Sequence, residues 1–102
     1  MAVLMREMLG QTLRELRLES TKTLREVSGE ARVSLGYLSE VERGQKEASS
    51  ELLVSVTDAL GLPLSFVLRE VSDRIAVHER VTIPDTVPEG LADEPAPLVG
   101  AR

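Results

Sequence analysis

Apolar residues recur every three or four positions along most of this chain, which is the spacing of one face of an α-helix. The pattern begins near Met5 and continues to Ile75. No stretch alternates apolar and polar residues for long enough to predict a strand. The sequence therefore predicts an all-α fold.

Cap and turn residues divide this pattern into successive helices. The first helix is expected over residues 3–19. Thr23 and Glu26 have the spacing of a capping box, in which a hydroxyl and a carboxylate each bind a free backbone amide. The second helix should therefore start near Leu24, and it should end at about residue 32.

A third helix is expected over residues 35–43, with Ser34 as its N-cap and Gly44 as its terminator. The second and third helices are short and are joined by a turn of about three or four residues. Two such helices form the pattern of a helix-turn-helix unit.

A fourth helix is expected to start at Ser49 or Ser50 and to stop at Gly61. The fifth should open with Pro63 in its first turn, where the missing amide proton costs nothing, and should run over about residues 63–78. Its apolar face is longer than the core of the first four helices should need, so we expect this face to pair with a second copy of the chain. The residues of the face are Leu64, Val67, Leu68, Val71 and Ile75.

The composition excludes several classes of function. The chain has 102 residues, a net charge of −5 and 2% aromatic residues, which fits one small domain with an aliphatic core. It has no cysteine and a single histidine, His78, so we expect no metal site, no cofactor and no enzymatic activity. No apolar run approaches the roughly 18 to 20 residues of a membrane span, and we expect a cytoplasmic protein with no membrane partner.

The composition changes near residue 79. Four of the five prolines follow this point, and we predict an extended or disordered, Pro-rich tail over residues 79–102 after a helical domain over residues 1–78. The end of the tail, residues 98–102, is small and apolar, which makes it a candidate handle for a protease.

The second and third predicted helices follow a known register. Residues 23–44 read Thr-Leu-Arg-Glu-Val-Ser-Gly-Glu-Ala-Arg-Val-Ser-Leu-Gly-Tyr-Leu-Ser-Glu-Val-Glu-Arg-Gly. This segment, continued through Leu68, resembles the Cro/CI-type helix-turn-helix family of bacterial and phage regulators. It is also similar to actinobacterial regulators of Clp protease genes.

The resemblance implies a five-helix, Cro/CI repressor-like DNA-binding domain whose helix-turn-helix motif runs from Leu24 to Arg43. It further implies a homodimeric transcriptional regulator that binds double-stranded DNA at an inverted repeat. The narrower similarity implies an activator of Clp protease and chaperone genes, located on the nucleoid when bound to DNA.

Three positions depart from the usual pattern of the family. Leu24 stands where Gln is usual, Arg32 where Gly is usual, and Ala48 where Pro is usual. At Arg32 a side chain can adopt the left-handed backbone conformation only at some cost. These changes affect the family's base contacts rather than its fold.

Under this resemblance the third helix enters the major groove of DNA. Gly36 fits that role, because glycine in an exposed helix costs roughly 1 kcal/mol relative to alanine and close approach to a duplex is a reason to tolerate it. The candidates for reading bases are Leu35, Gly36, Tyr37, Ser39 and Glu40. The candidates for phosphate contacts are Lys22, Thr23, Arg25, Arg32, Ser34, Arg43 and Lys46.

These candidates also have plain structural interpretations. Gly36 can be an incidental surface residue, Glu40 a solvated carboxylate, and Tyr37 a ring packed against the second helix. Residues 22–46 carry five basic and four acidic side chains, whereas the rest of the chain is strongly acidic. Positive charge is thus concentrated at the motif, as phosphate binding requires.

By resemblance, Arg17 and Glu42 occupy the positions of a buried pair that joins the first helix to the end of the third. We interpret this pair as structural. The alternative function, from another class, is a helical protein-interaction module such as the antidote half of a toxin pair, whose tail wraps a partner. A third helix rich in exposed aromatic residues would favour that alternative.

Overall fold

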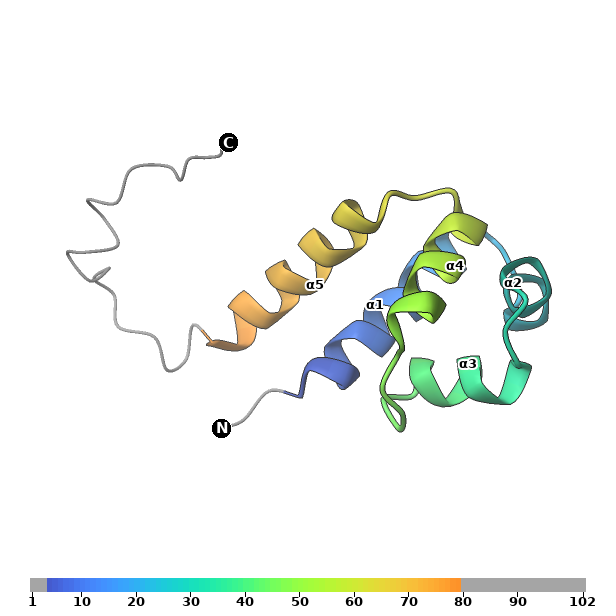
Figure 1. The fold of residues 1–102 in the computed structure, drawn as a ribbon. Coiled ribbons are helices and arrows are strands. Elements are labelled where there is room, and N and C mark those ends of the chain that lie inside the picture. The colour runs from blue at the N-terminus through green and yellow to red at the C-terminus, as the bar shows by residue number, and fades with distance from the viewer. Residues whose placement is uncertain (1–3, 80–102) are drawn as a thin grey trace.

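The computed structural model describes residues 4–79, which form five α-helices and no strand (Figure 1). The predicted all-α fold of five helices is confirmed. In chain order the helices are α1 (Met5–Glu19), α2 (Leu24–Ala31), α3 (Leu35–Glu42), α4 (Ser50–Leu60) and α5 (Leu64–Glu79). The predicted tail lies outside the described residues except for Glu79, which is the last residue of α5.

Side-chain caps start three of the helices at the predicted residues. The Thr23 hydroxyl accepts the Glu26 N–H at 3.0 Å, and the Glu26 carboxylate accepts the Thr23 N–H at 2.8 Å, which completes the capping box. Ser34 caps α3, and Ser49 rather than Ser50 caps α4. Local hydrogen bonds therefore set where these helices begin.

Several helix boundaries differ by one or two residues from the prediction. α1 begins at Met5 instead of residue 3, and α5 ends at Glu79 instead of residue 78. α3 ends at Glu42, and Arg43 is its C-cap. Pro63 precedes α5 instead of lying in its first turn, and its carbonyl accepts the N–H groups of Phe66 and Val67 at 3.0 and 3.3 Å. The Pro63 carbonyl thus accepts hydrogen bonds at the start of α5, and the missing N–H of proline costs nothing because the first N–H groups of a helix have no partner within it.

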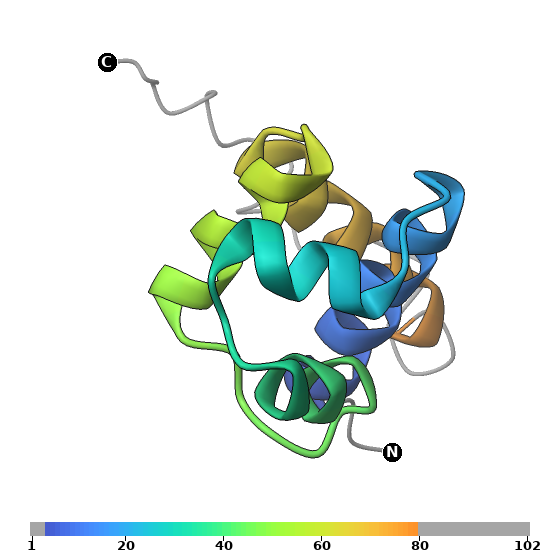
Figure 2. The same ribbon diagram turned by 90° about the vertical axis from the view of Figure 1, so that its right-hand side faces the viewer.

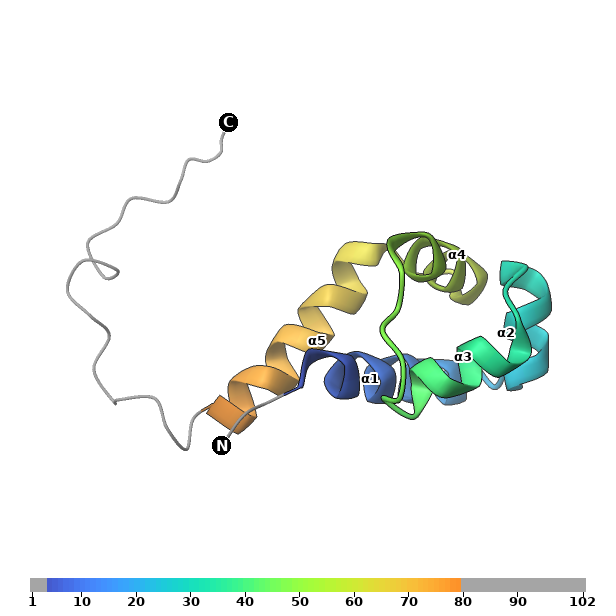
Figure 3. The same cartoon turned by 60° about the horizontal axis from the view of Figure 1, so that its bottom comes forward.

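The helix α1 lies between α3 and α5 in the views of Figures 1 and 3, and both of these helices pack against it. In Figure 2, α2 crosses the front of the molecule and α3 lies below it. α2 packs on α3 and α4, so the two helices of the motif are held together by the rest of the domain. All five helices supply the core, whose buried apolar residues are Met8, Leu9, Leu13, Leu16, Val27, Ala31, Leu38, Val41, Leu52, Val56, Leu60, Val67 and Val71.

The expectation that the first four helices close the core alone is wrong. Val67 and Val71 are only 0% and 3% exposed, because α5 lies along α1 and contributes these side chains to the same core. Met5, expected on the buried stripe of the first helix, is instead 60% exposed in the first turn of α1. The surface that α5 leaves open is therefore different from the one predicted.

Among residues 4–79 no single helix is both long and apolar enough to span a membrane. α4 and α5 reach the required length and apolar content only as a pair bent by 105°. Both helices place apolar residues in the core.

Candidate nucleic-acid interface

The helix α3 buries one side against the domain and leaves the other side open. Leu38, Val41 and Glu42 are buried. The open side contains an exposed glycine and three partly exposed side chains, and we call it the reading surface. Its residues are Leu35, Gly36, Ser39 and Glu40.

The fold of the chain does not require glycine at position 36. A methyl group on Gly36 would meet only the Oγ of Ser34, at 4.0 Å. Space therefore remains open in front of α3 at this point. This space fits both explanations of Gly36, close approach of a duplex and an incidental surface glycine. Only the first predicts that Gly36→Ala weakens DNA binding.

Two basic residues hold the polar side chains of the reading surface. A guanidinium nitrogen of Arg43, Nη1, donates to the Oγ of Ser39 at 2.5 Å, and its Nη2 donates to Gln45 at 3.2 Å. The Nζ of Lys46 lies 3.3 Å from a carboxylate oxygen of Glu40. Ser39 and Gln45 are neutral, and Arg43 forms no ion pair with a carboxylate in the part of the chain that the structure describes, so its charge is available at the edge of this surface.

Further phosphate candidates flank the motif on α2 and in the turn. Arg25 and Arg32 are exposed, and neither forms an ion pair with a carboxylate among residues 4–79. Arg32 adopts the left-handed conformation, with φ 57° and ψ 44°, at the position where the family usually has glycine. Thr23 and Ser34 cap α2 and α3, so the free amides of both helix starts lie beside them.

Lys22, a predicted phosphate contact, is engaged within the chain through both of its partners. The Nζ of Lys22 donates to the carbonyl of Ala59 at 2.9 Å and to the carboxylate of Glu30 at 2.7 Å. It thereby satisfies a free carbonyl at the end of α4. A phosphate contact of Lys22 stays a prediction, and it would require the ammonium group to leave Ala59 or Glu30.

The hydroxyl of Tyr37 has a structural partner that the sequence did not indicate. It donates to the carbonyl of Glu47 at 2.9 Å and accepts the N–H of Ser49 at 3.1 Å. These bonds attach the loop after α3 to the helix itself. The hydroxyl of Tyr37 is therefore occupied within the chain, and a base-reading role for Tyr37 stays a prediction. These bonds were not predicted because their partners are backbone groups, which every residue carries.

Arg17 and Glu42 form a bidentate ion pair between α1 and the last residue of α3. Nε of Arg17 donates to Oε2 of Glu42 at 2.8 Å, and Nη2 donates to Oε1 at 3.0 Å. Both side chains are buried, and the bonds to the carboxylate raise the pKa of Arg17 although burial opposes the shift. The guanidinium therefore stays charged, and the pair fixes the end of α3.

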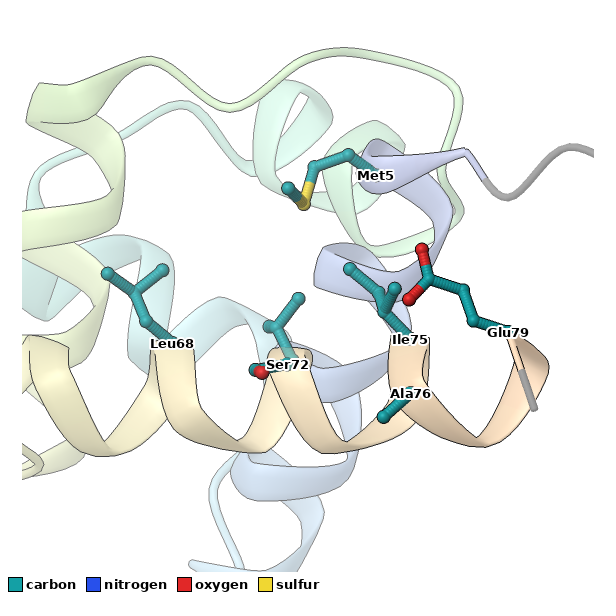
Figure 4. A pocket seen from close by; sticks show the side chains of 7 residues that line it. Met5, Leu68, Ser72, Ile75, Ala76 and Glu79 are labelled. Carbon is teal, nitrogen blue, oxygen red and sulfur yellow. The ribbon is translucent and has the colours of Figure 1, made fainter. Parts of the chain in front are cut away.

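A separate hollow of about 320 Å³ lies between the start of α1 and the part of α5 from Leu68 to Glu79 (Figure 4). Met5 and Leu68 are 60% and 48% exposed on its wall, and Ile75 is half-buried there. Of the five residues predicted for a dimer face, two lie in the core and Leu68 is the most open. We call the hollow and its rim the α1–α5 face, formed by Met5, Leu68, Ser72, Ile75 and Ala76.

Residues 8–66 match a family model described as a helix-turn-helix domain. The chain belongs to the Cro/CI-type helix-turn-helix family. Its α2 and α3 are the helices of this motif.

Known members of this helix-turn-helix family resemble the chain over most of its length. It is 58% identical over 81 residues to the transcriptional regulator ClgR of Mycobacterium tuberculosis, which covers 79% of this chain and 72% of that protein. It is 36% identical over 98 residues to the HTH-type transcriptional regulator DdrOP3 of Deinococcus deserti, covering 92% of this chain and 70% of the relative. The crystal structure of the clp gene regulator ClgR from Corynebacterium glutamicum superposes with a TM-score of 0.73 at 49% identity, over 78% of this chain and 84% of that chain.

Proposed function

We propose that this chain is a sequence-specific DNA-binding transcriptional regulator that reads the major groove with α3. The observation that carries the proposal is the reading surface. Apart from Leu35 its residues are small or polar, it is open in front of Gly36, and Arg43 and Lys46 lie at its edge. An α-helix with such a surface fits the major groove, while flanking cations bind phosphates.

The residues of the reading surface suggest how bases are distinguished. Leu35 can contact a thymine methyl group, and Glu40 can accept from a cytosine amino group once its pairing with Lys46 is rearranged. The cations available for phosphates are Arg25, Arg32 and Arg43, together with Lys46 once its pairing with Glu40 is rearranged.

Binding to duplexes of many sequences tests this division of roles. Arg43→Ala and Lys46→Ala should weaken binding to all sequences and lower the slope of log affinity against log salt by about one each. Leu35→Ala and Glu40→Ala should instead change the preferred sequence. If none of the four folded variants alters operator binding, α3 is not the reading element.

The functional unit that we propose is a homodimer. An exposed apolar surface such as the α1–α5 face is a liability for a monomer, and a second copy using the same face covers it with two-fold symmetry. Two reading helices related in this way would lie about one DNA turn apart, roughly 34 to 36 Å. The operator should then be an inverted repeat with half-site centres about 10 base pairs apart or a multiple of that distance.

The regulated genes that we propose are those of Clp proteases and chaperones, with the chain acting as an activator. The support is the 58% identity to ClgR of M. tuberculosis and the likeness to the clp gene regulator of C. glutamicum. Genome-wide binding together with transcript levels after deletion of the gene tests both parts. Binding confined to unrelated promoters would remove the target assignment and leave DNA binding intact.

The role of the tail remains a prediction, since residues 80–102 lie outside the described residues. We propose that the tail is dispensable for operator binding and serves as a handle for a protease. Truncation at Pro84 should leave operator affinity unchanged and lengthen the cellular half-life. An unchanged half-life would remove the proteolytic role.

The protein-interaction alternative has less support from α3. An interface for a protein partner is enriched in aromatic and Met side chains, whereas the reading surface contains neither. Its only aromatic neighbour on α3, Tyr37, binds the chain's own loop.

A further inference from the structure

The helix α1 contains a glycine in its interior at its contact with α3. Glycine weakens a helix interior relative to alanine, so its presence there needs a reason. A methyl group on Gly10 would overlap the carbonyl oxygen of Val41 and would lie 2.9 Å from the carbonyl oxygen of Glu42. Both oxygens belong to the backbone, which cannot turn aside as a flexible side chain can. Gly10 is therefore required for α1 to lie this close to the end of α3.

A second close contact lies one turn earlier on α1. Gly44 follows α3 with φ +74°, and a methyl group on it would lie 3.1 Å from the Cα of Glu7. Nε of Arg6 donates to the carbonyl of Gly44 at 3.1 Å. The loop that leaves α3 is thus held directly against the backbone of α1.

The end of α3 is also ordered by its own hydrogen bonds. The N–H of Gly44 donates to the carbonyl of Val41 at 3.0 Å, and the N–H of Gln45 donates to that of Glu40 at 2.9 Å. This is a Schellman motif, which makes the helix end a rigid unit. A displacement of α1 at Gly10 would therefore move α3 as a body.

We propose that Gly10 is a positioning residue for operator recognition. By admitting the backbone of α1 to the carbonyls of Val41 and Glu42, it sets the direction in which the reading surface leaves the domain. This inference rests on the proposed function. It adds a residue that touches no DNA and yet determines sequence discrimination.

The position of α1 between α3 and α5 extends this role to the dimer. On its other side α1 carries α5 (Figure 3). The ion pair of Glu15 with Arg74 joins these two helices. A single helix therefore relates the reading surface to the α1–α5 face. A shift of α3 against α1 would change the spacing and tilt of two reading helices on one operator, whereas loosely oriented phosphate contacts would tolerate it.

The test uses Gly10→Ala in the full chain. The probes are an operator selected from random duplexes with the wild-type protein and a duplex of unrelated sequence. We expect Gly10→Ala to remain helical and dimeric, to bind the operator at least ten-fold more weakly, and to bind the unrelated duplex within about two-fold of wild type. The salt slope should be unchanged, because no phosphate contact is lost.

Val67→Ala is the matched control, because it removes methyl groups from a fully buried side chain on α5 and leaves the α1–α3 contact intact. It should lower the melting temperature while keeping the ratio of operator to unrelated affinity. A merely structural role for Gly10 would give the same pattern, with loss of stability and an unchanged ratio, and that result would overturn the proposal.

Arg6→Met keeps the test decisive if Gly10→Ala does not fold. This variant removes the hydrogen bond to Gly44 and the exposed ion pair with Glu47, at 3.5 Å, from a partly exposed side chain. We expect the ratio of operator affinity to unrelated-duplex affinity to fall severalfold while the salt slope stays constant. An unchanged affinity ratio, or a salt slope lower by about one, would overturn the positioning role. A wild-type chain that prefers no sequence would instead overturn the proposed function itself.

Discussion

The guanidinium of Arg17 donates two hydrogen bonds to the buried carboxylate of Glu42, at 2.8 and 3.0 Å, and a third to the carbonyl of Lys22 at 3.0 Å. This arrangement joins α1, the loop after it and the last residue of α3. The cost of removing both charges from water offsets much of their attraction, so such a pair adds less to stability than its geometry suggests. Its larger effect is to hold α3 in one orientation.

Arg17→Met should lower the free energy of unfolding by about 3 to 5 kcal/mol, because Glu42 is left buried without its partner. Urea unfolding measures the change. Replacing both residues, with Arg17→Met and Glu42→Leu, should recover much of the stability because no uncompensated charge remains. A double variant as unstable as the single one would contradict this explanation.

The same pair predicts that its contribution to stability does not change with pH near neutrality. The pKa of Arg17 is raised in the folded state by its bonds to Glu42, so the stability from this shift is present below the unfolded-state pKa and is lost only as pH rises through the still higher folded-state pKa. Titration of Arg17 should therefore leave the stability difference between wild type and Arg17→Met constant from about pH 7 to pH 9. Unfolding curves at both ends of that range check it.

The pairing of Glu40 with Lys46 predicts a gain of non-specific binding. Glu40→Gln should release Lys46 to bind phosphate, raising affinity for unrelated duplexes and steepening the salt slope by up to about one. The fold should be unaffected, because the pair is exposed and such pairs contribute about 0 to 1 kcal/mol. Titrations at several salt concentrations measure the slope, and adding Lys46→Ala should abolish the gain. An unchanged affinity for unrelated duplexes in Glu40→Gln would show that the pairing with Glu40 does not restrict the phosphate contact of Lys46.

The parts of this fold that could be predicted from the sequence are those set by local chemistry. Thr23, Ser34 and Ser49 cap helices through hydrogen bonds that span three residues, so sequence spacing reveals them. The bonds of Tyr37 and Lys22 could not be predicted in this way. Their partners are backbone groups distant in the sequence, and every residue carries such groups.

The site shows the same division. Gly10 is visible in the sequence as an interior helical glycine, but the carbonyl of Val41 that explains it becomes apparent only when α1 and α3 are packed together. The outward direction of α3 followed from its apolar period. The open side of α5 did not, because Val67 and Leu68 are adjacent apolar residues and only the packing on α1 decides which of them is buried.

Gly36→Ala should separate the two explanations of this glycine by moving stability and affinity in opposite directions. Without a steric cost in the free chain, alanine should stabilise the fold by up to about 1 kcal/mol. Operator affinity should fall at least ten-fold if the backbone approaches the duplex closely. Thermal unfolding and a binding titration measure the two effects.

Gly29→Ala is the control for Gly36→Ala. It also replaces an exposed helical glycine with no neighbour within 4 Å, so it should add stability without weakening operator binding. Equal operator affinity for Gly36→Ala and wild type would make Gly36 an incidental surface residue.

Tyr37→Phe should act on the loop rather than on sequence choice. The variant loses the hydroxyl that bridges Glu47 and Ser49, which should cost about 0.5 to 1.5 kcal/mol per hydrogen bond. Hydrogen exchange at Ser49 should accelerate, and the preferred operator sequence should stay the same. A changed base preference in Tyr37→Phe would restore Tyr37 to the reading surface.

The α1–α5 face predicts how the oligomeric state responds to charge. Leu68→Glu should give a folded monomer, because it places a carboxylate on an exposed apolar position that a second copy would have to cover. Val77→Glu is the matched control, since Val77 is 56% exposed and lies nine residues, or about two and a half turns, from Leu68, on the opposite side of α5. Light scattering at micromolar concentration should find Val77→Glu dimeric and Leu68→Glu monomeric, with operator affinity much reduced only in Leu68→Glu.

Val71→Asp is not a suitable variant, because Val71 is 3% exposed and the substitution would unfold the core. A wild-type chain that is monomeric under these conditions, or a Leu68→Glu variant that remains a dimer, would show that the α1–α5 face does not join two copies.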